Sequence, residues 1–551
     1  MKPNEYKISS EKFNFVNNSD KIRDKELSTK PVSYIKDAFS RFKRNKASIL
    51  AAIIIGALIL FAVIAPMISP YSVSYQDTYF AYALPKNQVF SDLGIGFWDG
   101  CTNKEYTKEN YYYFYLMGEE TGHYAIKDQE YKIVQRPNQK GKMTDYYKVR
   151  LDTYQKTGMI FMDLTKAQYL DLQKYQNETG IQVIYPITNT KLRPTAAQDQ
   201  TNANYWYETK EVAGKTSIVF GKDNSVNDIY YKVWTQAEID AYLATLPESS
   251  KDEIKFKQEM KDNLEQMLKV GDNYNSIRVE GNEAEYYYAI EKTNGYYCRV
   301  NYYEYFVYYH SYVLKDGIEE PSFLFGATNY GQDIFTCLSS GARFSFILAV
   351  IVSVVNLLVG AIYGAIEGYY GGKIDLIMER FVEILSAVPF MIVITLLKYH
   401  MKNSSQVLIL FISFFLTGWI GMAGRTRMQF YRFKNQEYVL AARTLGATDK
   451  RIMFKHIFPN ALGTLIASCV LVIPGVIFSE TSLSYLGIIN LNSGNMTSVG
   501  TMLANAQPFL VSYPHMIFFP AMFICLLMLS FNLFGNGLRD AFNPSLRGSE
   551  D

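Results

Sequence analysis

Apolar and polar segments alternate along this 551-residue chain. A helix needs about 20 mainly apolar residues to cross a bilayer, and six runs come close to or exceed that length. The pattern therefore predicts a polytopic α-helical membrane protein with six transmembrane helices. The runs are Ala47–Ile68, Phe344–Ile366, Ile377–Leu397, Val407–Gly424, Ala461–Gly487 and Tyr513–Gly535.

The distribution of Lys and Arg predicts the direction of the spans. Segment 425–460, between the fourth and fifth runs, carries eight basic residues and two acidic ones, whereas Ile489–Ser512 carries no Lys or Arg. Because basic residues accumulate in cytoplasmic loops, we expect segment 425–460 in the cytoplasm. Both termini are then cytoplasmic, and the long segment after the first run lies outside. The basic residues are Arg425, Arg427, Arg432, Lys434, Arg443, Lys450, Arg451 and Lys455.

Residues 1–46 are expected to form a cytoplasmic arm that ends in an amphipathic helix. Within Tyr34–Lys46, apolar side chains recur at helical spacing and basic side chains fill many of the other positions. Such a helix lies in the membrane interface, so membrane lipid is an expected partner. A plain cytosolic helix is the alternative. The apolar positions are Ile35, Ala38, Phe39 and Phe42.

Residues 70–322 separate the first two runs and are expected to form an inserted extracytoplasmic domain. Aromatic and β-branched runs predict strands, while Thr165 and the pair Ser250 and Glu253 resemble residues that cap helix starts. The domain is therefore predicted to be α+β. The expected strands are Tyr111–Leu116, Met159–Leu164, Ile181–Tyr185 and Asn301–Tyr309, and one expected helix is Thr165–Tyr175.

This inserted domain shows no catalytic signature. Its tripeptide Gly-Lys-Thr at 214–216 matches the end of a phosphate-binding loop, but Thr209 stands where glycine is needed and a strand-like run follows. His123 and His310 do not have zinc-ligand spacing. We therefore predict no catalytic residue, no metal site and no cofactor, and the chain is not expected to be an enzyme.

Two features of the inserted domain admit two interpretations each. Cys101 and Cys298 are candidates for a disulfide, since an exterior domain meets oxidising conditions; two free thiols are the alternative. The tyrosine clusters that begin at Tyr111, Tyr286 and Tyr302 form either a contact surface for a peptide or protein, or sheet faces and core.

The basic segment 425–460 contains a predicted short helix. Glu437–Leu445 is rich in helix formers, and Gly446 can take the left-handed conformation that ends a helix. The resemblance here is to the EAA loop of permease subunits of bacterial ABC importers, and it implies that this helix docks on a cytoplasmic ATPase subunit. An ordinary basic loop with a surface helix is the alternative. The matching residues are Glu437, Ala441, Ala442 and Gly446, followed by His456, Pro459 and Asn460.

Three further stretches resemble the C-type permease subunits of oligopeptide and dipeptide ABC importers, the binding-protein-dependent transport inner-membrane components. They are FGATNYGQD at 325–333, ETSLSYLG at 480–487 and GNGLRDAFNP at 535–544. In the first stretch, residues 327–329 and Gln332 stand where the family has a Thr-Asp pair and an Arg. These departures concern only the local role of that outer element.

The resemblance implies a type I ABC importer permease fold that forms half of a peptide translocation pathway in a bacterial cell membrane. It also implies two cytoplasmic ATPase subunits, a second permease subunit and an extracytoplasmic peptide-binding protein as partners. The chain itself lacks an ATP-hydrolysing signature, so the energy is expected to come from those partners. The net charge of +2 argues against nucleic acid as a partner.

Two other functions stay open at this point: a cell-surface receptor or adhesin with a polytopic anchor, and an ABC permease for a non-peptide small solute. Pro389, Glu480 and Ser482 are candidate pathway residues. Pro inside a span marks a kink, which is tolerated where neighbours or a water-filled cavity satisfy the freed backbone, and an ionisable residue inside a span can face the pathway. Ser482 belongs to the same ETSLSYLG stretch as Glu480. For Glu480 the alternative is an interfacial carboxylate that fixes an outer loop. The expected organisation is 1–46 arm, 47–69 first span, 70–322 inserted domain, 323–538 permease domain and 539–551 cytoplasmic tail.

Overall fold

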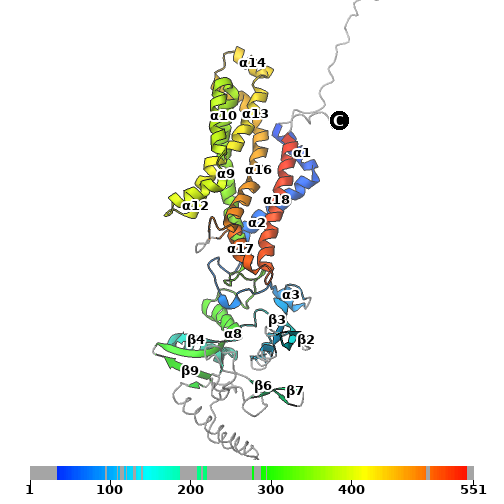
Figure 1. The fold of residues 1–551 in the computed structure, drawn as a ribbon, viewed down its shortest axis with the longest axis vertical. Helices are drawn as coiled ribbons and strands as arrows, with labels where there is room; N and C mark the ends of the chain where they lie inside the picture. The colour runs from blue at the N-terminus through cyan, green and yellow to red at the C-terminus, as the bar shows by residue number, and fades with distance from the viewer. Residues whose placement is uncertain are drawn as a thin grey trace, which may run out of the picture.

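A computed structural model describes residues 34–93, 96–107, 110–111, 114, 117–118, 121–127, 132–137, 141–185, 208–212, 215–219, 276–277, 287–292, 294–491 and 497–542. Figure 1 shows a bundle of long helices joined at one end to a smaller domain of strands and short helices. Helix α14 lies at the opposite end of the bundle from the strands.

The helix bundle contains the predicted spans. In the described chain, five helices are long and apolar enough to cross a membrane, counting α12 with α13 and α15 with α16 as single spans. Helices α10 and α11 meet the same length and apolarity requirement only as a bent pair, which makes the total six if the pair is counted as one broken span. The bundle comprises α1 (Tyr34–Arg44), α2 (Lys46–Ile68), α9 (Ile334–Tyr370), α10 (Gly372–Ser386), α11 (Phe390–His400), α12 (Gln406–Thr417), α13 (Ile420–Phe433), α14 (Glu437–Thr444), α15 (Asp449–Arg451), α16 (Phe458–Tyr485), α17 (Val499–Ala506) and α18 (His515–Phe542).

The third predicted run, Ile377–Leu397, is a bent pair of helices, and the bend falls at the proline inside the run. It is divided between α10 and α11, which meet at an angle of 71°. Pro389 sits at the break with a ψ of 134° and precedes the first residue of α11. Proline lacks an amide hydrogen and disfavours helical backbone at the residue before it, so it ends α10 and starts α11.

Three glycines on one face of α9 let this helix approach α13 closely. Gly360, Gly364 and Gly368 recur every four residues, and a Cβ atom added at them would lie 2.7, 2.1 and 2.7 Å from backbone oxygens at the start of α13 or within it. The two backbones are therefore in direct contact. Small residues at this spacing are a common means of helix association in membranes. Helices α9 and α13 consequently pack as one unit.

The inserted domain combines antiparallel sheets with short helices. One sheet has the order β1-β3-β2, a second has the order β4-β10-β9-β8 with β5 beside β10, and β6 pairs with β7. The helix α5 follows β4 directly. The strands are β1 (Cys101–Thr107), β2 (Lys132–Pro137), β3 (Met143–Asp152), β4 (Met159–Thr165), β5 (Ile184–Tyr185), β6 (Glu208–Val212), β7 (Lys215–Val219), β8 (Ser276–Ile277), β9 (Tyr287–Lys292) and β10 (Gly295–Asn301); the helices are η2 (Thr78–Phe80), α3 (Gln88–Asp92), α5 (Lys166–Thr179), α8 (Tyr302–Tyr308) and the π-helical η5 (Tyr309–Leu314).

The predicted elements of this domain have mixed outcomes. The strand Met159–Leu164 and the helix after Thr165 are confirmed: the Thr165 hydroxyl accepts the amide hydrogen of Gln168, and the Gln168 side-chain oxygen accepts the amide hydrogen of Thr165. Of Ile181–Tyr185, only the last two residues form a strand. The capped helix expected at Ser250 and Glu253 lies outside the described residues.

Two predicted strands were wrong because tertiary packing and helix capping outweighed β-propensity. Asn301–Tyr309 is mostly the helix α8, in which the Asn301 side chain accepts the amide hydrogen of Glu304 and caps the first turn. The described residues of Tyr111–Leu116, which are Tyr111 and Phe114, are also helical. Successive residues of α8 alternate between buried and half-buried positions, a pattern that mimics a strand.

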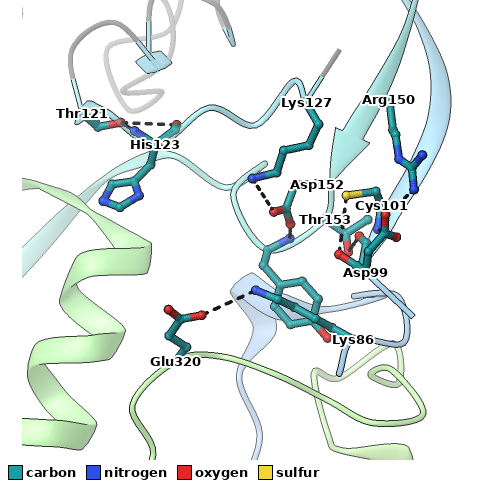
Figure 2. Close-up of polar contacts among 12 residues, drawn as sticks. Lys86, Asp99, Cys101, Thr121, His123, Lys127, Arg150, Asp152, Thr153 and Glu320 are labelled. Atoms are coloured by element: carbon teal, nitrogen blue, oxygen red, sulfur yellow. Dashed lines mark hydrogen bonds and ion pairs between the residues drawn. The ribbon is translucent and has the colours of Figure 1, made fainter. Parts of the chain in front are cut away.

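The inserted domain leaves the bundle and returns to it at one place. The amide of Lys86 donates to the carbonyl of Phe323 at 2.9 Å, and the amide of Ala327 donates to the carbonyl of Ala83 at 2.8 Å. The Lys86 ammonium also approaches the Glu320 carboxylate at 3.9 Å (Figure 2). A Cβ at Gly331 would lie 1.6 Å from the Asp77 carbonyl oxygen, so glycine is required there. The two ends of segment 87–322 are therefore held side by side.

Candidate functional site

The expected helix, bend and second helical piece are present in segment 425–460. Helix α14 covers Glu437–Thr444, and Gly446 takes a left-handed conformation with φ of +82° immediately afterwards. The chain then continues through α15 and a π-helical turn, Ile452–Ile457, into α16. Because glycine adopts positive φ without steric cost, Gly446 sets the bend.

One side of α14 is fixed to the bundle by a small apolar cluster. Val439, which is fully buried, is the residue of α14 that enters it. The cluster also takes Tyr369 from the end of α9 and Phe430 from α13. We call this cluster the α14 seat; its buried members are Ala365, Tyr369, Phe430, Val439, Ile452, Met453 and Ile457.

Polar contacts tie the segment that contains α14 to the bundle at two points. The Tyr369 hydroxyl donates to Asp449 Oδ1 at 2.6 Å, and Arg443 Nη2 donates to the Tyr369 hydroxyl at 3.5 Å. Asn460 Nδ2 donates to the Tyr438 hydroxyl at 3.1 Å and to the His456 carbonyl at 2.8 Å. The family resemblance had singled out Asn460 and His456, whereas Tyr369 and Val439 carried no signal in the sequence.

The other side of α14 is exposed. Glu437 and Ala441 are exposed, Ala442 is half-buried, and the apolar side chains of Leu440 and Leu445 are 46% and 88% exposed. A helix that is firmly seated on one side and presents leucines on the other can bind a protein partner. Exposed apolar residues next to charged ones are typical of such interfaces.

A second polar site, next to the α14 seat, joins three helices around Arg427. Its guanidinium donates to Asp375 of α10 through Nε at 2.7 Å and through Nη2 at 3.0 Å. It also lies 3.2 Å from Glu379 and 3.5 Å from the buried Glu367 of α9. Sequence reasoning counted Arg427 only as one of the basic residues, because its partners are far away along the chain.

The three candidate pathway residues are not brought together. Glu480 is fully buried, and its carboxylate accepts hydrogen bonds from the hydroxyls of Ser345 and Ser484, both at 3.0 Å. Ser482 is half-buried and donates to the carbonyl of Phe478 at 2.8 Å. Pro389 is exposed at the break between α10 and α11. The surroundings of Glu480 thus link α9 to α16.

The candidate disulfide between Cys101 and Cys298 does not form, which corrects that expectation. Both cysteines are free and lie in different sheets, on β1 and β10 respectively. The Cys101 thiol points to the carbonyl of Asp99 (Figure 2), and Cys298 is buried opposite Met162 of β4. Burial raises the pKa of each thiol to about 12, so both are protonated at neutral pH.

Two family models match the chain, and their matches coincide with the helix bundle. The model described as binding-protein-dependent transport system inner membrane component matches residues 357–548, which include α14 and its seat. The model described as N-terminal TM domain of oligopeptide transport permease C matches residues 33–85. The helical bundle and these matches define a membrane-spanning permease of the ABC transport class.

Curated relatives narrow the class further. The chain is 45% identical over 223 residues to the oligopeptide transport system permease protein OppC of Bacillus subtilis, covering 40% of this chain and 72% of the relative. It is 40% identical over 224 residues to the dipeptide transport system permease protein DppC of the same organism, covering 40% of this chain and 69% of the relative. The chain belongs to this family of oligopeptide and dipeptide transport permeases. The relatives support transport, not the receptor or adhesin alternative.

Among solved structures, an inward-facing form of the methionine ABC transporter MetNI is similar over 38% of this chain and 96% of the other, at 15% identity. The TM-score of 0.31 is too low for this likeness to bear on the fold.

Proposed function

We propose that this chain forms half of the translocation pathway of an ATP-driven importer for oligopeptides or dipeptides, and that α14 docks on a cytoplasmic ATPase subunit. The observation that supports it is α14 itself, held by Val439 on one side and presenting Leu440 and Leu445 on the other. Displacement of α14 by the ATPases would reorient the spans, so that a cavity opens alternately to each side.

The arrangement of the chain supports the proposed sides of the membrane. If α14 is cytoplasmic, the inserted domain at the opposite end of the bundle is extracytoplasmic (Figure 1). Both termini are then cytoplasmic. The proposed partners are two ATPase subunits, a second permease subunit and an extracytoplasmic peptide-binding protein. Membrane lipid is proposed to cover α1, where Phe39 is 58% exposed while Phe42 packs against Phe534 of α18 with ring centroids 5.3 Å apart.

Replacing Leu445 by aspartate is expected to abolish co-purification of the ATPase subunits. The side chain is 88% exposed, so a charge there leaves the chain folded but removes apolar area from the interface. The measurement is affinity purification of the tagged chain in mild detergent, with mass spectrometry and an ATPase assay of what co-purifies. Leu314→Asp, at a leucine of the inserted domain that is 48% exposed, is the matched control and should retain the ATPases. A wild-type chain that is recovered without any ATPase would refute the proposal.

We assign the inserted domain the role of receiving the binding protein and its peptide, because it stands over the outer ends of the spans (Figure 1). Deleting residues 87–322 and closing the gap with a short Gly-Ser linker is expected to leave assembly intact, since Lys86 and Phe323 are hydrogen-bonded neighbours. Uptake of a radiolabelled peptide should fall when the binding protein is limiting. Uptake equal to that of the full-length chain at every binding-protein concentration would eliminate this role.

A further inference from the structure

Helix α10 has little burial against the rest of the permease part. It is described throughout, and none of its side chains is buried within this chain. Its position depends on a few polar contacts instead. Asp375 accepts two hydrogen bonds from Arg427 and a third from the Tyr431 hydroxyl at 2.5 Å, and the Tyr363 hydroxyl of α9 donates to the Met378 carbonyl at 2.9 Å. Loss of the Asp375 contacts would therefore loosen α10 from α13, leaving the Glu379 contact with Arg427, without opening an apolar core.

The contact between Arg427 and Asp375 fixes direction as well as distance. A guanidinium that donates two parallel hydrogen bonds to one carboxylate holds both side chains in a single geometry. Glu379 of α10 and Glu367 of α9 lie against the same guanidinium. We call these residues the Arg427 cluster: Glu367, Asp375, Glu379, Arg427 and Tyr431.

The Arg427 cluster and the α14 seat belong to the same pair of helices. On α13, Phe430 of the seat follows Arg427 by three residues, so both lie on neighbouring positions of one helix face. On α9, Tyr369 of the seat follows Glu367 by two residues, and Lys434 Nζ donates to the Gly368 carbonyl between them at 3.1 Å. The close backbone contact at Gly364 and Gly368 makes α9 and α13 move together.

We infer that Arg427 and Asp375 are positioning residues that pass a displacement of α14 to α10 and so to the broken span α10–α11. This inference rests on the proposed function. The seat transmits the movement of α14 to α9 and α13, and the Arg427 cluster is the link from that pair to α10. The 71° break at Pro389 lets α10 follow α13 while α11 keeps its own contact with α12, where Phe390 and Phe414 have ring centroids 5.0 Å apart.

The test uses the full transporter, with both permeases, the ATPases and the binding protein, in proteoliposomes. Asp375→Asn and Arg427→Gln are expected to assemble and to keep basal ATP hydrolysis, but to lose about tenfold in pentaalanine uptake per ATP, a typical size for coupling between sites. Arg427→Lys keeps the charge but not the double hydrogen bond, so an intermediate loss is expected. The matched control is Arg380→Gln, at an exposed ion pair with Glu383 that stays within α10; it should transport as the wild type does.

A double substitution tests whether the α14 seat and the Arg427 cluster act in series or independently. If Tyr369 in the seat and Asp375 act in series, Tyr369→Phe combined with Asp375→Asn loses no more coupling than the worse single variant; independent effects would multiply. Three results would each overturn the inference. They are losses of coupling that multiply in the double variant, wild-type coupling in Asp375→Asn, and failure of all the cluster variants to assemble. A wild-type transporter that neither takes up pentaalanine nor hydrolyses ATP faster with it would instead refute the proposed function, and this inference with it.

Discussion

Replacing Gly364 by alanine is expected to force α9 and α13 apart and to give a protein that is poorly assembled. The added methyl group would lie 2.1 Å from the Ala423 carbonyl oxygen, and that atom belongs to the backbone, so it cannot rotate away. Overpacking of a tight contact costs about 3 kcal/mol at the upper end of its usual range. The measurement is the midpoint of thermal unfolding in detergent, together with the yield of monodisperse protein by size-exclusion chromatography.

Gly475→Ala is the matched control for this prediction. Gly475 also lies inside a long helix of the bundle, α16, but no described atom comes within 4 Å of a Cβ placed there. Its alanine variant should unfold at the wild-type temperature or slightly above it, because alanine favours helix more than glycine does. If Gly364→Ala unfolds at the same temperature as Gly475→Ala, the direct backbone contact between α9 and α13 is not needed for the fold.

Replacing Glu480 by alanine is expected to destabilise the bundle, whereas Glu480→Gln should be nearly neutral. The carboxylate is fully buried and accepts hydrogen bonds from Ser345 and Ser484, so alanine leaves two buried hydroxyls without this acceptor and creates a cavity. The expected loss is about 3 kcal/mol, as for removal of one partner from a buried polar network. Glutamine keeps the size and one acceptor oxygen. Thermal unfolding in detergent measures both variants.

The same pair of variants distinguishes the two roles considered for Glu480. If Glu480 has a structural role, stability and peptide uptake should fall together in the alanine variant, and both should persist in the glutamine variant. If Glu480 instead lines the pathway, peptide uptake should fall in the glutamine variant while its unfolding temperature stays at the wild-type value. The full burial of Glu480 in this chain favours the structural role.

The sequence predicted well those features that depend on neighbouring residues. Five of the six apolar runs are single spans because hydropathy over about 20 residues is itself the physical requirement for crossing a bilayer. The helix, bend and helical continuation around Gly446 followed from helix propensity and from the conformational freedom of glycine. The capping residue Thr165 likewise marked the start of α5 correctly.

The features that sequence reasoning missed depend on contacts between distant residues. The local signals at α8 disagree, since its aromatic residues suit a strand whereas Asn301 can cap a helix, and the helix also depends on packing of Tyr302 and Phe306 against residues of η2 and β4. Asp375 and Arg427 are 52 positions apart, so their contact carries no periodic signal. The separation of Cys101 from Cys298 depended in the same way on which strands pair.

The meeting of Lys86 and Phe323 also has a consequence for the history of the chain. Because segment 87–322 begins and ends at adjacent points, a permease ancestor could have gained it through a single insertion without any change in the order of its spans. The match to the N-terminal permease model stops at residue 85, next to this junction. The position of this junction is therefore compatible with exchange of the inserted domain for another without a break in the transport core.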